Sequence, residues 1–204
     1  MICVVVLAAG CSRRMGVQKL LLPFGGKTVI AHIVDQLLAS LVDEIHVVVG
    51  CQAKRIIREL SGRPICIATN RNYKSGMLSS VRCGLRALPQ QCRAVLVALG
   101  DQPSITSSLI DRMLQSFAAT EKRILVPLYR DKRGHPILFS VVYRDQILTH
   151  YDDVGLRGLL HAHPDDIFEL TVSTSAVLCD MDCPQDYRRE LALIEKRASK
   201  SNSP

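Results

Sequence analysis

Apolar and polar residues are grouped along the first half of the chain in blocks typical of alternating β-strands and α-helices. Short apolar runs, rich in β-branched residues, predict strands buried on both faces at 3–7, 44–50, 65–68 and 94–99. Between them, apolar residues recur at three- and four-residue spacing, which predicts helices at about 28–40, 53–60, 78–88 and 106–117. This alternation predicts an α/β fold of three layers, in which helices cover both faces of a mostly parallel sheet.

The second half of the chain departs from this alternation. Two strand-like segments, 124–128 and 137–140, are joined by a short charged turn, and a connection without a helix makes such a pair antiparallel. The sheet is therefore expected to be mixed. The remaining pattern predicts a helix at 154–161, a strand at 167–172 and a last extended segment at 176–181.

Two residues mark helix starts, and a change in composition marks the end of the domain. Thr106 suits the N-cap of the helix that follows it, and Pro184 suits the first turn of a closing helix that ends near Arg197. No internal repeat or linker divides the chain, so residues 1–198 are expected to form a single domain. Residues 199–204 form a polar tail, which we expect to be disordered.

The loop after the first strand combines small residues with positive charge. It opens with Ala8, Ala9 and Gly10, which leave the backbone accessible to a ligand. Three cations follow: Arg13, Arg14 and Lys19. A buried strand that opens into such a loop presents backbone N–H groups and cationic side chains to phosphate. The sequence therefore predicts a phosphate-binding loop.

Two better-known phosphate motifs do not fit this chain. The dinucleotide fingerprint G-x-G-x-x-G fails because Gly10 is followed by Cys11 and Ser12. The segment GGKT at 25–28 resembles the end of a Walker A loop, but that motif also needs a glycine where this chain has Leu21. The loop must therefore hold phosphate in another way.

Composition narrows the choice of partner. With 204 residues and 48% hydrophobic content, the chain can bury a full core. The formal charge of +7 favours an anionic partner, whereas 4% aromatic residues and no tryptophan argue against a stacking platform for nucleic acid. We therefore expect a phosphorylated small molecule. The absence of an apolar run of about 18 residues predicts no membrane span, and the short apolar start is no signal peptide, which together favour a cytoplasmic protein.

Eight cysteines raise the question of a metal site or of disulfides. No C-x-x-C pair occurs, and the closest pair, Cys179 and Cys183, has no partner pair elsewhere. This spacing favours buried or incidental thiols in a reducing compartment over a metal site or a disulfide framework. Cys11 is the exception, because neighbouring arginines in the phosphate loop would lower the pKa of its thiol.

Acidic residues are predicted at the same sheet edge as the phosphate loop. Asp101 follows the apolar strand at 94–99, where an uncompensated carboxylate is costly and a bound Mg²⁺ would compensate it. Asp182 is expected to supply a second ligand, with Asp180 as an alternative. Simpler interpretations stay open: Asp101 begins a turn before Pro103, and Asp182 caps the closing helix.

The chain opens with a long motif, L-A-A-G-x-S-x-R-M-G-x-x-K-L-L-L-x-x-x-G-K, that resembles the MobA-like NTP transferase family and, within it, molybdenum cofactor cytidylyltransferases most of all. The family pattern L-G-D-x-P is matched by LGDQP. The pattern D-x-D-T-P-E-D is matched by DMDCPQD, with Cys183 and Gln185 as departures. The resemblance covers nearly the whole chain and implies a Rossmann-like fold of the nucleotide-diphospho-sugar transferase type.

The resemblance implies a Mg²⁺-dependent nucleotidyltransferase that joins CMP from CTP to the phosphate of molybdopterin and releases pyrophosphate. It implies catalytic roles for Arg14, Lys19 and Asp101, and a Mg²⁺ site at Asp101 and Asp182. The nucleotide contacts that it implies are Leu7, Ala8, Ala9, Gly10, Arg14, Lys19, Asn70, Gly76, Ser80 and Asp101. A xanthine dehydrogenase-type molybdoenzyme would receive the product.

Some points stay open. Gln18 stands where relatives commonly have asparagine, which leaves the base of the nucleotide undecided. The segment 134–136 occupies the place of a stretch that faces the acceptor in relatives, but a lone histidine before proline gives no reason to assign His135 a chemical role. The alternative activity is a sugar- or polyol-phosphate nucleotidyltransferase, and the alternative without catalysis is an accessory protein of a molybdoenzyme. Intact Lys19 and Asp101 speak against the accessory role.

Overall fold

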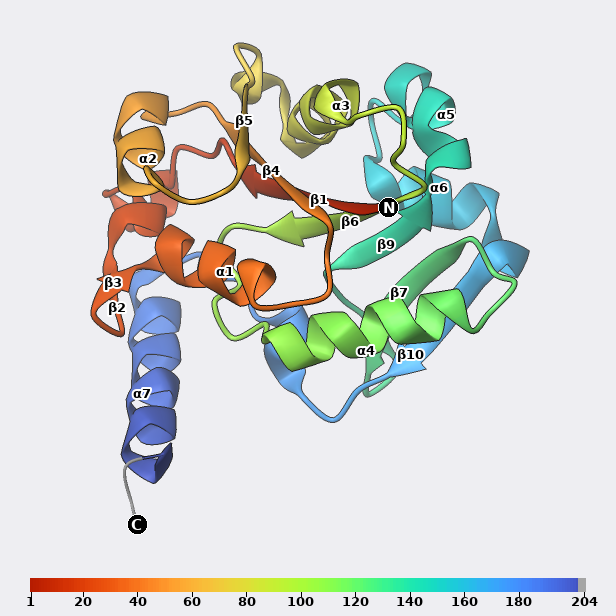
Figure 1. The fold of residues 1–204 in the computed structure, drawn as a ribbon. Helices are drawn as coiled ribbons and strands as arrows, with labels where there is room; N and C mark the ends of the chain where they lie inside the picture. Colours follow the sequence, from red (N-terminus) through yellow and green to blue (C-terminus); the bar gives the residue numbers. More distant parts are fainter. Residues whose placement is uncertain (202–204) are drawn as a thin grey trace.

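The computed structural model describes residues 1–201 and is built around a mixed β-sheet (Figure 1). In this part of the chain, eight strands form the sheet in the order β10-β7-β9-β6-β1-β4-β5, with β8 paired to β7. These strands are β1 (Ile2–Ala8), β4 (Glu44–Val49), β5 (Cys66–Thr69), β6 (Ala94–Leu99), β7 (Ile124–Tyr129), β8 (Lys132–Arg133), β9 (Ile137–Ser140) and β10 (Ile167–Thr171). A separate hairpin consists of β2 (Pro23–Phe24) and β3 (Lys27–Thr28).

Strand direction divides the sheet into two parts. β1 lies between β4 and β6 and is parallel to both, and β5 continues the parallel part beyond β4. β9 is antiparallel to β6 and to β7, as its short connection predicted, while β10 is parallel to β7. The mixed, mostly parallel sheet confirms the predicted fold class, and it brings the loops after β1, β5 and β6 to one edge.

Helices cover both faces of the sheet (Figure 1). They are α1 (Val29–Leu38), α2 (Ala53–Glu59), α3 (Met77–Ala87), α4 (Ser107–Ala118), α5 (Arg144–Thr149), α6 (Leu156–Ala162) and α7 (Pro184–Ser201). On one face, Val4 and Val6 of β1 share a core with α1, α2 and α4; on the other, Val5 shares a core with α3, α5 and α6. Each large apolar side chain buried in this way contributes about 1.5–3 kcal/mol of transfer free energy. No helix in residues 1–201 is both long and apolar enough to span a bilayer.

The predicted helix signals are present, with one difference in length. Thr106 accepts a hydrogen bond from the Leu109 amide at 3.3 Å and so caps α4, and Pro184 begins α7. The sequence places the end of α7 near Arg197, but the helix continues to Ser201. It therefore includes part of the predicted tail, whose last residues, 202–204, lie outside the described residues.

One local prediction differs from the structure, and two local elements were not predicted. The segment predicted to be extended at 176–181 begins instead as a 3₁₀ turn at Ser175–Leu178, which Thr174 caps through a hydrogen bond from the Ala176 amide. The GGKT segment forms the β2–β3 hairpin, because Gly25 and Gly26 both adopt the positive φ angles that a two-residue hairpin turn needs. α5 was not predicted, since a six-residue helix with a single buried residue gives too short an apolar pattern.

A charged cluster on the outer side of α1 predicts a pH-dependent stability. Asp35 accepts hydrogen bonds from Arg63 Nε at 2.7 Å and from Lys27 Nζ at 2.6 Å. The Arg63 guanidinium, with help from Lys27, lowers the pKa of Asp35 below its ordinary value of 3.8. Because the folded pKa is depressed, the stabilisation is complete above the unfolded pKa and is lost as the pH falls through the folded pKa.

Asp35→Asn is therefore expected to lower the free energy of unfolding by about 1 kcal/mol at pH 7, where the ion pairs are intact in the wild type. The difference between the two proteins should shrink as the pH approaches 3, which urea unfolding at a series of pH values measures. Asp145→Asn, on the exposed side of α5, is the control and should change little. An equal difference at pH 7 and at pH 3 would contradict this assignment.

Candidate functional site

A pocket of about 360 Å³ opens at the carboxyl ends of β1 and β6. It is lined by most of the residues that the sequence singled out: Leu7, Ala9, Gly10, Arg14, Lys19, Gly76, Ser80, Asp101 and Asp182. They come from the loop after β1, from the start of α3, from the end of β6 and from the segment before α7. The topology therefore brings four distant segments of the chain to one cavity, as the sheet-edge argument predicted.

Two predicted nucleotide contacts do not line this pocket. Ala8 is fully buried in the core at the end of β1. The Asn70 amide donates hydrogen bonds to Ser79 Oγ at 2.8 Å and to Ser80 Oγ at 3.0 Å. Its carbonyl oxygen accepts from the Asn72 backbone N–H at 2.8 Å. Asn70 thus shapes the segment that leads into α3, and the structure gives its amide protein partners instead of the open pocket.

Ser12 and Gln18 hold the loop after β1 in place. Ser12 has a φ angle of 52°, in the left-handed region, and its hydroxyl donates to Gln18 Oε1 at 2.8 Å. Gln18 is 5% exposed, and its Nε2 donates to the Gly10 carbonyl at 3.0 Å. The Lys19 amide in turn donates to Ser12 Oγ at 3.1 Å. This bracing fixes where Lys19 leaves the loop, and it turns Gln18 toward the backbone and away from the pocket.

Gly10 and Gly76 leave room in the wall of the pocket. A Cβ added to either residue would contact no protein atom within 4 Å, so packing within the protein does not require a glycine at Gly10. Gly76 has a φ angle of 94°, which disfavours other residues, and it begins α3. Both positions let a ligand approach the backbone. Tyr73 and Met77 flank Gly76 and also line the pocket; sequence analysis did not select them.

Four charged side chains converge on the pocket. Lys19 Nζ lies 2.5 Å from Asp101 Oδ2 and 2.9 Å from Asp182 Oδ1. Arg14 Nη1 lies 2.9 Å from Asp182 Oδ2. The Lys19 side chain is 13% exposed, whereas that of Arg14 is 79% exposed. The buried lysine is therefore a fixed charge, and the exposed arginine can change position at little cost when an anion enters.

The backbone explains why Asp182 faces Lys19 and does not cap α7. The Met181 amide donates to the Asp101 carbonyl at 3.0 Å, which aligns the segment before α7 with the end of β6. The amides of Asp182 and Cys183 donate to Asp186 Oδ2, at 3.1 and 2.9 Å. Asp186, in the first turn of α7, thus reaches back to the amides before the helix, while the Asp182 carboxylate is occupied by Lys19 and Arg14.

Burial and the neighbouring carboxylates shift the pKa of Lys19 in opposite directions. Burial on its own would lower the pKa of Lys19, but Asp101 and Asp182 outweigh it, and the pKa lies above its usual value. Lys19 is therefore charged at neutral pH. Burial, together with the negative charge of Asp101, raises the pKa of Asp180, whose carboxylate accepts from Gln102 Nε2 at 2.8 Å. Asp180 thus lies beside the lysine-centred cluster without an ion pair to Lys19.

A second cavity of about 360 Å³ is lined by Gln102 and Asp180, which are close in sequence to Asp101 and Asp182 of the first cavity. Arg133 and Arg157 line its wall, Arg133 with its Nε 2.7 Å from Glu169 Oε1, and His135 lies close enough to Asp101 and Arg157 to feel both charges. Burial lowers the pKa of His135, which keeps its imidazole neutral near pH 7. Gly134 and His135, from the segment that the resemblance assigns to the acceptor side, both line this cavity. Arg157 was not selected from the sequence, because α6 carries no recognisable motif.

The thiol of Cys11 lies outside the pocket lining. Cys11 instead contacts Cys51. The hydrogen bond to Cys11, and secondly burial, raise the pKa of the Cys51 thiol. All eight cysteines lie among the described residues, and all are free thiols.

Comparison with known proteins adds independent findings. Residues 4–167 match the model of a family described as the MobA-like NTP transferase domain. A nicotine blue oxidoreductase from Paenarthrobacter nicotinovorans is 31% identical over 196 residues, which cover 92% of this chain and 95% of the relative. A molybdenum cofactor cytidylyltransferase from Escherichia coli is 26% identical over 184 residues, which cover 90% and 92%.

Solved structures give the same overall picture. A Mycobacterium tuberculosis protein overlaps this structure with a TM-score of 0.83 and 29% identity over 94% of this chain and 97% of its own. Its complex with manganese overlaps with a TM-score of 0.79 and 28% identity over 94% of this chain and 98% of its own. This agreement over nearly the whole chain confirms the predicted fold of the nucleotide-diphospho-sugar transferase type.

Proposed function

The chain belongs to the MobA-like NTP transferase family, and from this premise we propose that it transfers CMP from CTP to the phosphate of a molybdopterin-type cofactor. A phosphate oxygen of the acceptor attacks the α-phosphorus of CTP and forms a new P–O bond. The bond between the α- and β-phosphates breaks, and pyrophosphate leaves with its electron pair. Both substrates are anions, which agrees with the formal charge of +7.

One observation carries this proposal: two separate cavities are lined by carboxylates that lie close together, since Asp180 of the second feels the charges of Asp101 and Asp182 of the first, and these carboxylates mark the boundary between the cavities. The first contains the glycine-containing loop and Lys19, and the second contains Arg133 and Arg157. Asp101 and Asp182 line the first, while Asp180 lines the second. A nucleotide in the first cavity and a phosphorylated acceptor in the second would present their phosphates to each other at this boundary.

The residues of the first cavity would contact different phosphates of the nucleotide. The backbone around Gly10, which lacks a side chain to obstruct it, and the exposed Arg14 would hold the β- and γ-phosphates. Lys19 would lie near the α-phosphate, where charge develops as the bond to pyrophosphate breaks. Because the Ser12–Gln18 brace fixes the start of Lys19, its charge is already in place before the substrate binds.

The carboxylates fit a divalent cation. Asp101 and Asp182 both direct an oxygen at the same ammonium group, and paired carboxylates are ligands that Mg²⁺ prefers. The related Mycobacterium tuberculosis protein, which has been solved with manganese, supports a divalent site in this fold. When bound, Mg²⁺ would supply the positive charge that neutralises the α-phosphate. The backbone of Lys19 would stay where the loop holds it, and its ammonium would only turn from the two carboxylates to the adjacent phosphates.

No general base is needed for this reaction, because a phosphate nucleophile is already ionised at neutral pH. The chain therefore has to align two anions and offset their repulsion, which is what Lys19 and the arginines of the two cavities do. His135, kept neutral by burial, adds no charge to the acceptor side. Its place in the wall of the second cavity makes it a contact for the acceptor and not a proton carrier.

The choice of CTP rests on the loop and on the relatives. The L-A-A-G form of the loop resembles cytidylyltransferases, and the E. coli relative with that activity aligns over 90% of this chain. Gln18, which left the base undecided at the sequence level, is buried and bonded to the loop backbone. It therefore gives no reason to favour another base.

The proposal is tested by incubating the protein with each NTP in turn, Mg²⁺ and purified molybdenum cofactor, and measuring pyrophosphate. Release with CTP that depends on the cofactor is the expected result. Release that requires sugar or polyol phosphates would instead identify that class of nucleotidyltransferase. No release from any mixture would indicate the accessory role, in which the product-receiving molybdoenzyme is a binding partner only.

Removing one cation from the second cavity should affect the acceptor and not the nucleotide. Arg157→Ala is expected to raise KM for the cofactor by about tenfold or more, since a hydrogen bond to a charged group contributes about 1.5–3 kcal/mol. KM for CTP should stay unchanged. Arg86→Ala, at an exposed position on α3 outside both cavities, is the control. An equal rise in both KM values would show that the second cavity does not hold the acceptor.

A redox activity is the second candidate, because the relative that is 31% identical over 92% of this chain is an oxidoreductase that carries nicotine blue in its name. The positive charge of Lys19 and Arg14 in the first cavity favours the phosphates of the main proposal. NADH or NADPH oxidation in the presence of nicotine blue tests this candidate. Oxidation that is faster than nucleotidyl transfer would replace the main proposal.

A further inference from the structure

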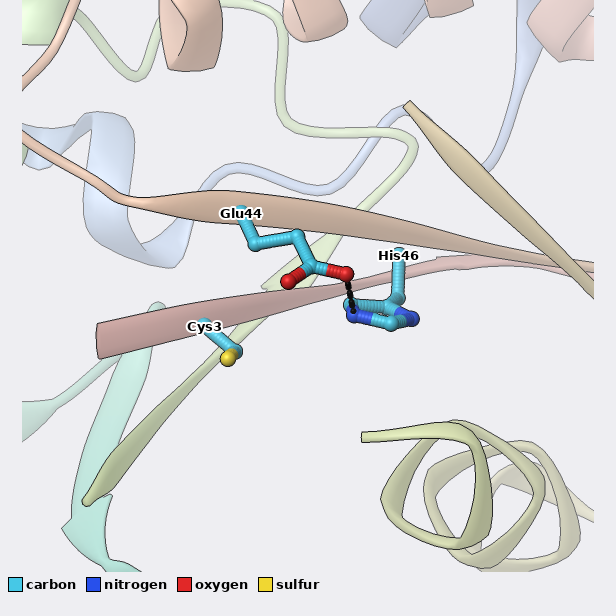
Figure 2. Close-up of side chains that lie close together, drawn as sticks. All are labelled: Cys3, Glu44 and His46. Carbon is cyan, nitrogen blue, oxygen red and sulfur yellow. Dashed lines mark ion pairs between the residues drawn. The ribbon is translucent and has the colours of Figure 1, made fainter. Parts of the chain in front are cut away.

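Cys3, Glu44 and His46 form a cluster at the amino ends of β1 and β4, the sheet edge opposite the pocket. Cys3 pairs in register with Glu44, and His46 follows two residues later on the same face of β4. Figure 2 shows their side chains gathered beside these two strands, with the Glu44 carboxylate directed at the His46 ring. None of the three contributes to either cavity described above.

The three side chains offer one sulfur, one nitrogen and one oxygen ligand. These atoms all lie within 4.8 Å of one another. A tetrahedral zinc ion, bound at about 2.0–2.3 Å from each donor, holds its ligand atoms roughly 3.3–3.8 Å apart. Small side-chain rotations would therefore bring the observed donors to the distances of a zinc site.

The buried imidazole of His46 is a second, independent observation that points to a ligand at this cluster. Its side chain is 3% exposed, and neither ring nitrogen makes a hydrogen bond of good geometry among the described residues. Nε2 lies 2.9 Å from Glu44 Oε1, so the two groups are adjacent without being properly bonded. Buried polar groups in folded proteins nearly always have a partner, and those that do not need an explanation. A metal ion between His46 and Glu44 supplies that partner.

Neighbouring thiols extend the donor set. β5 pairs with β4 so that Cys66 lies next to His46, and the Cys66 thiol donates to Glu44 Oε1 at 3.3 Å. Cys66 is exposed, whereas Cys3 is fully buried. The cluster thus has a potential fourth ligand at its exposed rim.

We propose that Cys3, Glu44 and His46 bind a zinc ion that ties β1 to β4, with Cys66 at the fourth position. Thiolate, imidazole and carboxylate are the ligands that zinc uses in proteins, and a site closed by four protein ligands is structural. The spacing along the chain gave no sign of this site because its ligands come from adjacent strands and not from one C-x-x-C segment. The site is separate from the Mg²⁺ site that the nucleotidyltransferase proposal requires.

The test uses the full chain without a histidine tag, stripped with a chelator and then titrated with Co²⁺ and Zn²⁺. Co²⁺ should give a thiolate-to-cobalt absorption band that is complete at one equivalent. Zn²⁺ should displace the bound Co²⁺ and abolish the band, with a Kd for Zn²⁺ below about 1 μM, and it should raise the Tm of the protein. His46→Gln and Cys3→Ser should each weaken Zn²⁺ binding at least about 100-fold. Cys179→Ser, outside the cluster, should bind as the wild type does.

Asp101→Asn separates this site from the nucleotide pocket, because it should keep the one-equivalent cobalt band. If His46→Gln or Cys3→Ser fails to fold, the cobalt band and the Zn²⁺-dependent rise in Tm of the wild-type protein still show whether the protein binds zinc through a thiolate. A wild-type chain without the thiolate band, or a band that is unchanged in His46→Gln, would overturn the proposal.

Discussion

Asp101→Asn is expected to lower kcat for nucleotidyl transfer at least about 1,000-fold, which corresponds to about 4 kcal/mol in the barrier. Asp101 is the less exposed of the two carboxylates that contact Lys19, and it lines the first cavity, close enough to Asp180 for their charges to interact. Asparagine keeps the shape of the side chain but removes the charge that binds a divalent cation. The α-phosphate would then meet the acceptor phosphate without that neutralising charge. Pyrophosphate release from CTP and molybdenum cofactor measures the loss.

The control for this variant is Asp145→Asn, which removes a carboxylate from the exposed side of α5. It should keep full activity, and both variants should keep the wild-type circular dichroism spectrum. Because Lys19 still pairs with Asp182 in Asp101→Asn, the variant has no unpaired buried ammonium and should fold. More than a tenth of wild-type activity in a folded Asp101→Asn protein would show that Asp101 does not hold the metal.

Lys19→Ala is expected to cost about 3 kcal/mol in the barrier, roughly a hundredfold in rate, by analogy with the loss of one preorganised donor. The Lys19 ammonium is mostly buried, charged at neutral pH and fixed by the brace that Ser12 and Gln18 provide. Its charge is most valuable when negative charge develops on the leaving pyrophosphate. The loss should therefore appear mainly in kcat and less in KM for CTP.

Lys54→Ala, on the exposed side of α2, is the matched control and should leave both constants unchanged. Steady-state kinetics with CTP as the varied substrate distinguishes the two possible roles of Lys19. A rise in KM with an unchanged kcat would mean that Lys19 only helps to bind the nucleotide. That outcome would contradict its place beside the α-phosphate.

The strands and helices around the site follow directly from the apolar pattern. β6 is buried throughout, and so is β1 apart from Ile2 and Leu7. The two strands are parallel neighbours, so the loops that follow them, with Gly10 and Asp101, necessarily meet. The pattern fails where elements are short or capped by side chains. α5 buries only Ile147, and the 3₁₀ turn after Thr174 replaces a predicted extended segment.

The sequence predicted which residues lie at the site, because the end of a strand fixes where the following loop lies. It did not predict which atoms their polar side chains bond to. Asn70 shows the limit, because an amide next to a pocket can bond equally well to Ser79 and Ser80. Gln18 shows it too, since only the folded loop reveals that its amide braces Gly10. Contacts between polar side chains depend on rotamers and on tertiary distances, which spacing along one chain does not encode.

The sequence did not predict sites whose residues come from distant elements and carry no motif. His46 and Cys3 lie 43 positions apart in the chain, and only the parallel pairing of β1 with β4 brings them together. Arg157 likewise reaches the second cavity from α6, a helix without any motif.

The central claim is that the loop after β1 and the Lys19–Asp101–Asp182 cluster hold the triphosphate of the nucleotide. A crystal of the protein soaked with α,β-methylene CTP and MgCl₂ tests it most directly, since this analogue cannot release pyrophosphate. The account predicts the triphosphate against the backbone at Gly10, with Lys19 at the α-phosphate and a metal ion between Asp101 and Asp182. A pocket that stays empty, or a nucleotide bound elsewhere on the protein, would contradict it.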